Sequence, residues 1–226
     1  MAVIDIVLLL IFGGVTYCVA SEGAWGAAIT AFCVILGGLI AMNFFEPICN
    51  SLLGNDYWWQ VRLDLVVLVG LFAAAVAGLR AGADYLSPVY IGVHRMVHEG
   101  ARWGCGLLTG YVTMAFLLTA LHTAALDREF IGFKAERANF FQTSPDRQWL
   151  GFTQWTTERV FCKSPARIFD GPVIELGEPG AVPNKVWPSF PIRYATRRER
   201  GAGAPVATKQ TTVQPVAPPK AGGPAF

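Results

Sequence analysis

Four long apolar stretches occupy most of the first 125 residues, and they constrain the fold more than any other feature of the sequence. A bilayer core roughly 30 Å thick needs about 20 helical residues to cross it, at a rise of about 1.5 Å per residue. The apolar stretches approach or exceed this length at residues 3–20, 24–45, 61–79 and 103–125. They predict an all-α membrane protein with about four transmembrane helices.

The charged residues are few and unevenly distributed. Only 15% of residues are charged, whereas 53% are hydrophobic, and soluble domains usually carry about 25% charged residues. No Lys or Arg precedes Arg62, while most of the basic residues lie between Arg128 and the end. A water-soluble globule is excluded on this composition, and the lipid bilayer is the expected environment of the first half.

The first apolar stretch is expected to remain as a membrane span. A cleavable signal peptide needs a positively charged segment before its apolar region, and the only charged side chain in residues 1–6 is Asp5. Aromatic residues mark the ends of the later spans, at Trp25, Trp103 and residues 57–59. Amphipathic rings favour the headgroup level, which supports these boundaries.

Between the third and fourth spans, residues 80–102 contain a break at Ser87-Pro88 and the polar run His94 to Glu99. We expect a short surface helix there. After residue 126 the composition becomes mixed polar and aromatic, which predicts an extramembrane region over residues 127–195. The final residues, 196–226, are rich in Pro and Ala and have almost no large apolar side chains before Phe226, so they are expected to be disordered.

An amphipathic helix is predicted over residues 145–162 of the extramembrane region. Ser144, Pro145 and Asp146 match an N-cap, a first helical proline and a carboxylate in the positive first turn. One broad face of this helix carries Trp149, Phe152, Trp155, Thr156 and Val160. That face either lies on the membrane interface or covers a small extramembrane core.

Catalytic motifs are lacking in the sequence. There is no G-x-S-x-G, Walker or dinucleotide-binding pattern, and the five cysteines are scattered singly. The sequence therefore predicts no enzyme, no catalytic or metal-binding residue, no cofactor and no nucleic-acid partner. A remaining hypothesis is a metal or haem protein that uses His94, His98 and His122, of which the first two lie four residues apart.

The predicted spans contain almost no ionisable residues, although ion-coupled pumps usually place such groups within the membrane. His122 is the only group of the fourth span that could titrate near neutral pH. A proton-driven transporter that acts as a single subunit is therefore disfavoured. An oligomeric transporter or channel remains an alternative, and its polar path would use Asn43, Thr109, Thr113 and Thr119.

Small residues recur at four-residue spacing in and near the last two spans, and such positions let membrane helices approach closely. We therefore predict that they are helix-packing positions of a bundle or an oligomer. They are Gly70, Ala74, Gly78, Gly82, Gly100, Gly104, Gly106 and Gly110.

Residues 1–126 resemble the colicin V production protein (CvpA) family. The resemblance rests on Ile4-Asp5 before the first span, Glu22-Gly23 in a tight first turn, and His94-Arg95 followed by the glycine pairs that enter the fourth span. It implies a non-enzymatic protein of the bacterial inner membrane, connected with colicin V production or export and with envelope maintenance. A scaffold role, with a second copy or other membrane proteins as partners, is what we expect. The resemblance also favours a cytoplasmic location for residues 80–102 and an outer location for the C-terminal region.

Overall fold

The computed structural model describes residues 3–53, 57–86, 94–124 and 143–160, and several shorter pieces between and after them. The shorter pieces are residues 129–130, 133–134, 140–141, 174–175, 186–187 and 190–191, together with Phe169 and Tyr194. The tail predicted to be disordered, residues 196–226, lies outside the described residues, as does most of the turn-rich region from residue 161 onward.

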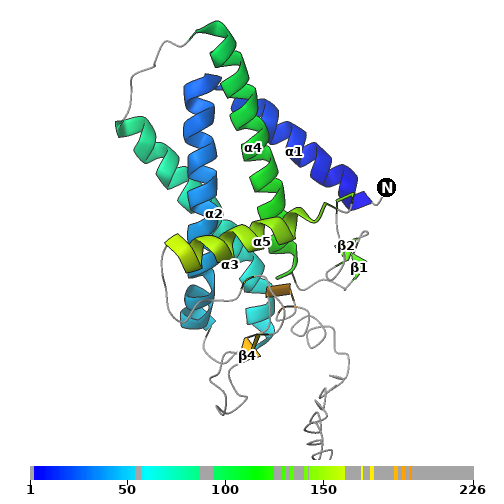
Figure 1. The fold of residues 1–226 in the computed structure, drawn as a ribbon. Helices are drawn as coiled ribbons and strands as arrows, with labels where there is room; N and C mark the ends of the chain where they lie inside the picture. Colours follow the sequence, from blue (N-terminus) through cyan, green and yellow to red (C-terminus); the bar gives the residue numbers. More distant parts are fainter. Residues whose placement is uncertain are drawn as a thin grey trace, which may run out of the picture.

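Four long helices form the body of the molecule: α1 (Val3–Ser21), α2 (Gly23–Leu53), α3 (Tyr57–Leu86) and α4 (Arg95–Leu121) (Figure 1). Each contains a segment long and apolar enough to cross a membrane, and these segments are Val3–Ser21, Gly23–Cys49, Leu63–Leu86 and Arg95–Leu121. The predictions of an all-α fold and of a multi-pass membrane protein are confirmed.

The ends of three helices differ from the predicted spans. α2 continues beyond Phe45 and through Pro47, which removes one backbone hydrogen bond without ending the helix. α3 continues to Leu86, and α4 starts at Arg95 and ends at Leu121. A separate surface helix within residues 80–102 was therefore a wrong prediction, because polar residues can extend an apolar helix beyond the hydrocarbon region. The break predicted at Ser87-Pro88 lies outside the described residues.

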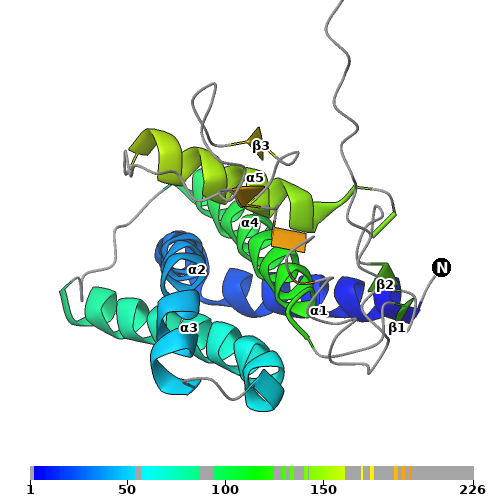
Figure 2. The same ribbon diagram turned by 90° about the horizontal axis from the view of Figure 1, so that it is seen from below.

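The turn from α1 to α2 is very short and depends on a left-handed glycine at the start of α2. Gly23 has a φ of 90°, a conformation that glycine adopts without steric cost, and only Glu22 lies between the two helices. The helices diverge from this turn, and α4 packs against both of them (Figure 1). α3 packs on the other side of α2, so that α2 lies between α3 and α4 (Figure 2).

A shorter helix, α5 (Pro145–Trp155), continues into a π-helical turn, η1 (Thr156–Val160), and lies across α4 and α2 on the side opposite α3 (Figures 1 and 2). Pro145 is its first residue and Asp146 is in its first turn. Ser144 occupies the N-cap position, but it is left-handed and its side chain makes no capping bond. Its carbonyl oxygen instead accepts from the backbone N–H groups of Arg147 and Gln148. The prediction of a side-chain cap was thus wrong.

The strands are two short antiparallel pairs. β1 (Glu129–Phe130) pairs with β2 (Phe133–Lys134), so that Phe130 lies opposite Phe133. β3 (Ile174–Glu175) pairs with β4 (Val186–Trp187), with Ile174 opposite Trp187. Each strand has only two residues, so these pairs connect chain segments without forming a layer of the fold.

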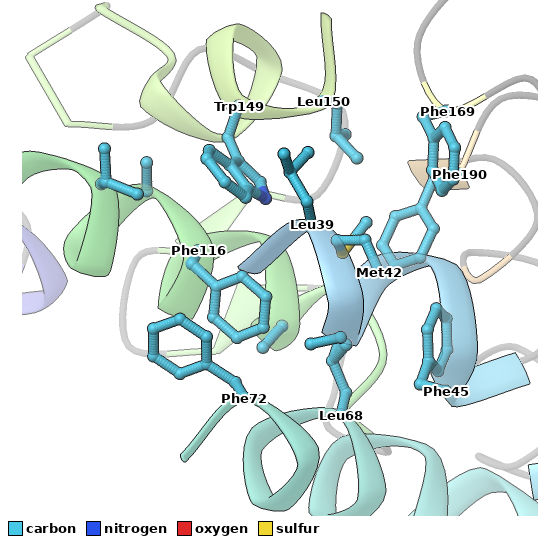
Figure 3. Close-up of a cluster of buried hydrophobic side chains, with 14 of the residues drawn as sticks. Leu39, Met42, Phe45, Leu68, Phe72, Phe116, Trp149, Leu150, Phe169 and Phe190 are labelled. Carbon is cyan, nitrogen blue, oxygen red and sulfur yellow. The ribbon is translucent and has the colours of Figure 1, made fainter. Parts of the chain in front are cut away.

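The main hydrophobic core lies around α2 and runs from the membrane spans into the extramembrane region (Figure 3). Phe72 of α3 stacks on Phe116 of α4 with ring centroids 4.1 Å apart, and Phe116 meets Trp149 of α5 edge to face at 6.3 Å. Farther along α2, the ring of Phe45 contacts that of Phe190 at 6.1 Å. Helices α2, α3 and α4 therefore share this core with the extramembrane residues Trp149, Phe169 and Phe190.

Candidate functional site

The most deeply buried polar contact described joins the end of α4 to the start of α5. His122 Nε2 lies 2.9 Å from Asp146 Oδ2, and the two side chains are 0% and 1% exposed. Burying a charged or strongly polar group is unfavourable unless it is paired. The contact between these residues, 24 positions apart in sequence, is therefore a specific feature of the fold, and we take it as the candidate site.

Each side chain of this pair also lies at the end of a helix. His122 caps the C-terminus of α4, where the helix dipole is negative, and Asp146 lies in the first turn of α5, where the dipole is positive. The imidazole and the carboxylate thus each face a favourable helix end as well as each other. Two helix termini and one side-chain contact together hold α5 at a fixed point on α4.

The surroundings of this pair are closed and apolar. The ring of Phe133 meets the His122 ring edge to face at 5.0 Å. Nearby Thr119 and Thr123 are buried, and their hydroxyls donate to carbonyl oxygens of their own chain segment, those of Ala115 and Ala120. The pocket beside α5 and the pocket between α1, α3 and α4 are lined by neither His122 nor Asp146.

The arrangement is suited to joining two helices rather than to catalysis. A general acid or base must reach the proton of a bound substrate, whereas the His122–Asp146 pair is enclosed. The second oxygen of Asp146, Oδ1, has no hydrogen-bond partner in the part of the chain that the structure describes. Among the described residues, the contact with His122 is therefore the polar pairing of this carboxylate, and we interpret the pair as a buried link between α4 and α5.

A second link between the same helices lies closer to the surface. The hydroxyl of Tyr111 donates to Gln148 Oε1 at 2.6 Å, and Gln148 Nε2 donates to the carbonyl oxygen of Thr143 at 2.9 Å. Tyr111 is three helical turns before His122 on α4. Two points separated along α4 thus fix both the position and the direction of α5.

Two of the glycines singled out in the sequence lie at a tight crossing of α4 with α1. A Cβ atom on Gly106 would be 2.9 Å from the carbonyl oxygen of Thr16, and one on Gly110 would be 2.8 Å from that of Phe12. Main-chain atoms cannot yield as a flexible side chain can. Only glycine therefore permits this approach of the two backbones.

The other small residues of the predicted set lie on open surface. A Cβ atom on Gly70, Gly78, Gly82, Gly100 or Gly104 would meet no atom within 4 Å, and Ala74 is exposed. Among the described residues, the three glycines of α3 thus make no close contact with another helix. The same four-residue spacing corresponds to a packed crossing at Gly106 and Gly110, but to an uncovered surface at Gly100 and Gly104 of α4 and along α3.

Two other glycines, which the spacing pattern did not single out, allow close packing of α2. A Cβ atom on Gly37 would be 2.7 Å from Val76 Cγ2 of α3, and one on Gly38 would be 2.9 Å from Trp149 Cη2 of α5. Adjacent glycines face different sides of a helix, so this pair lets α3 and α5 approach α2 from two directions. The Gly37-Gly38 dipeptide in an apolar span was the available sequence signal.

An ionic cluster, also unforeseen in the sequence, joins the α1–α2 turn to α3. Arg80 Nη2 lies 3.2 Å from Glu22 Oε2, and Arg80 also pairs with Asp84 one turn along its helix. Glu22 further accepts a hydrogen bond from the Thr30 hydroxyl at 3.0 Å. The sequence showed these charges near span ends, but their contact across 58 residues depends on the fold.

The three histidines do not form one site. His94 and His98 lie at the start of α4 and His122 follows its end, so about 36 Å or more of helix separates His122 from the other two. No group of three or more His, Cys, Asp or Glu side chains suited to a metal ion occurs among the described residues. The hypothesis of a metal or haem site that uses all three histidines is therefore wrong for a single chain.

Three of the four polar residues considered for a transport path bond to their own helices. Thr109 donates to the Cys105 carbonyl oxygen at 2.7 Å, Thr119 to that of Ala115 at 2.9 Å, and Asn43 Nδ2 to that of Leu39 at 2.9 Å. A hydroxyl or amide group bonded in this way has a hydrogen-bond acceptor within its own helix and needs none from a polar channel. In one chain, these three residues do not mark a polar path.

The chain was also compared with known proteins. No family model, no curated protein and no solved structure matched it.

Proposed function

We propose that this protein is a non-enzymatic, multi-pass membrane component that assembles with a second copy of itself through the outer face of α3. The uncovered face of α3 carries the proposal. In an 18-residue apolar window of each helix, only 11% of the residues of α3 are buried, against 56% of those of α4. A membrane helix that presents small residues to its surroundings allows another helix to approach its backbone closely.

A groove beside this face supports the same assembly. It lies between α1, α3 and α4, has a volume of about 680 Å³ and is lined almost entirely by apolar side chains, with Gly70 at its α3 wall. The groove is therefore continuous with the row of small residues that begins at Gly70. A helix of a second copy that follows this row would also have large side chains of the groove walls, such as Val66 and Ile11, to pack against.

The wider role that we propose follows the resemblance to the CvpA family. A scaffold in the bacterial inner membrane, connected with toxin production or export and with envelope maintenance, requires assembly in the bilayer and no reaction. The enclosed His122–Asp146 pair and the small, apolar helix faces are consistent with such a role.

Association in a bilayer tests the assembly. Full-length protein labelled with donor and acceptor fluorophores and diluted in lipid vesicles should show energy transfer that falls as the protein-to-lipid ratio falls. The Gly78→Leu variant should lose most of this transfer, because a large side chain on the open face prevents close approach. Gly14→Leu, at an equally open position of α1, should retain it.

Equal transfer in the Gly78→Leu and wild-type proteins would exclude the α3 face as the contact. In the source bacterium, deletion of the gene should impair envelope integrity, measured as sensitivity to detergent, and the Gly78→Leu gene should restore it less well than the Gly14→Leu gene. A selective solute flux through vesicles that contain the wild-type protein would instead support the oligomeric transporter or channel.

A further inference from the structure

The structure assigns a second apolar groove, between α2, α4 and α5, to an acyl chain of a membrane phospholipid. It has a volume of about 250 Å³, and its lining is almost entirely apolar. The residues that line it are Ile35, Leu108, Tyr111, Val112, Ala115, Gln148, Trp149 and Phe152. This surface is distinct from the α3 face and does not depend on self-association.

The walls of the groove indicate what fills it. Ile35 belongs to the spanning segment of α2, and Leu108 and Val112 belong to that of α4. Leu108 is 46% exposed, and the exposed apolar side chains of a membrane span face lipid tails. The groove is continuous with this lipid-facing surface, so hydrocarbon chains of the bilayer reach it directly.

The third wall, α5, has the sidedness of a helix that lies in a membrane interface. Its buried face, which includes Trp149 and Leu150, packs on the bundle. One exposed edge carries Phe152 and Trp155, 39% and 57% exposed, with the rings 6.5 Å apart. Aromatic side chains of this kind favour the boundary between headgroups and acyl chains.

The opposite edge of α5 is polar and faces the extramembrane region. Gln154 and Glu158 are joined by a hydrogen bond of 2.7 Å, and Gln154 Oε1 accepts from the backbone N–H of Phe169 at 3.2 Å. Residues 152 and 154 differ by about 200° around a helix. The aromatic edge therefore faces the bilayer while the polar edge faces the aqueous side.

Two polar side chains, Tyr111 and Gln148, also line the groove. Tyr111 and Gln148 bond to each other at 2.6 Å, and Gln148 is exposed. An acyl chain on the apolar wall would thus lie beside Gln148, whose amide nitrogen has one further hydrogen to donate to an ester oxygen of the same lipid. α5 then does what the two sequence-based alternatives described separately: it covers the core with one face and contacts the interface with an edge.

Photocrosslinking tests this assignment on the full-length protein in nanodiscs of phosphatidylcholine and phosphatidylglycerol. Benzoylphenylalanine in place of Phe152 should give, on irradiation, an adduct whose added mass is that of one phospholipid. The same group in place of Glu158, on the polar edge, should give at least tenfold less. A Leu108→Trp substitution, which narrows the groove from a lipid-facing position, should reduce the adduct at position 152 severalfold.

Crosslinks from position 152 to a second copy would identify a protein–protein contact and overturn the assignment. Equal lipid adducts at positions 152 and 158, or none at position 152, would also overturn it. The irradiation is repeated with a chain that carries both benzoylphenylalanine at position 152 and the Gly78→Leu substitution. Lipid adducts at position 152 should persist when self-association is lost, which separates this site from the α3 face.

Discussion

The helices α4 and α3 have similar length, apolar character and glycine spacing, but α4 is largely buried in the bundle and α3 is largely exposed. Both are about 30 residues long, apolar over most of their length and marked by glycines four residues apart. α4 packs against α1 through Gly106 and Gly110 and is linked to α5 by the buried contact between His122 and Asp146. α3 packs on α2 and leaves its glycines uncovered. Helix-packing patterns thus identify surfaces able to pack, while the rest of the fold determines which are occupied within one chain.

Loss of the buried Asp146 carboxylate should lower the stability of the protein more than any other change and tests the contacts of α4. Asp146→Ala should destabilise the folded protein by about 3–5 kcal/mol, because it removes one partner of a buried pair and leaves the other in an apolar enclosure. The free energy of unfolding, measured in detergent by titration with sodium dodecyl sulfate and circular dichroism, gives the effect. The double variant His122→Leu/Asp146→Leu should regain most of the loss. A single variant as stable as the wild type would show that α5 is held without this link.

A large side chain at the α1–α4 crossing should have the next largest effect. Gly110→Leu places a Cβ atom 2.8 Å from the Phe12 carbonyl oxygen, so the helices must separate. Overpacking of this kind costs about 1–3 kcal/mol, again measured by unfolding in detergent. Gly14→Leu on α1 is the matched control, because its Cβ atom meets nothing within 4 Å. Equal stability of the two variants would contradict the tight crossing.

The ionic cluster between the α1–α2 turn and α3 should contribute less to stability. Glu22→Gln removes the charge that faces Arg80 but keeps the shape of the side chain. The two side chains are 40% and 27% exposed, and partly exposed ion pairs contribute about 0.2–1 kcal/mol. Unfolding at low and high salt provides the measurement, and the difference between variant and wild type should shrink as salt is added. An effect as large as that of Asp146→Ala would place this cluster in a low-dielectric environment.

The smallest effect on monomer stability is expected from a substitution on the uncovered face of α3. Gly78→Leu adds a side chain where no atom lies within 4 Å, and leucine favours helix over glycine by about 1 kcal/mol or less. The unfolding free energy in detergent, at protein concentrations that give monomers, should be unchanged or slightly higher. A loss comparable to that of Gly110→Leu would remove the contrast between the two helices.

Hydropathy predicted the four spans because the thickness of a bilayer fixes the length of apolar sequence that crosses it. It did not predict the helix ends, since residues such as Arg95 and Glu99 continue α4 without contributing apolar surface. Spacing also missed Gly37 and Gly38, which act singly toward two different partners. The periodicity of small residues reports one face of one helix, whereas α2 is contacted on several sides.

The candidate site was divided in the sequence between two separate observations. His122 was noticed as a titratable group at a span end and Asp146 as a carboxylate in a helix start, and each was explained locally. Their pairing requires the intervening chain to return α5 to the end of α4, which no local pattern encodes. Of the two outcomes left open for the amphipathic helix, burial of Trp149 shows that one face packs on the bundle, while contact of the exposed edge at Trp155 with the membrane interface stays a prediction.

The one-residue turn between α1 and α2 links the two helices during biosynthesis. With only Glu22 between them and Gly23 reversing the chain, neither helix can enter the bilayer in an orientation independent of the other. The translocation machinery must therefore accept them as one hairpin, whose two arms diverge and leave a slot between them. α4 emerges from the ribosome about 40 residues after the end of α2, so the slot stays open to lipid until synthesis has passed α3, and closure of the bundle is a late step.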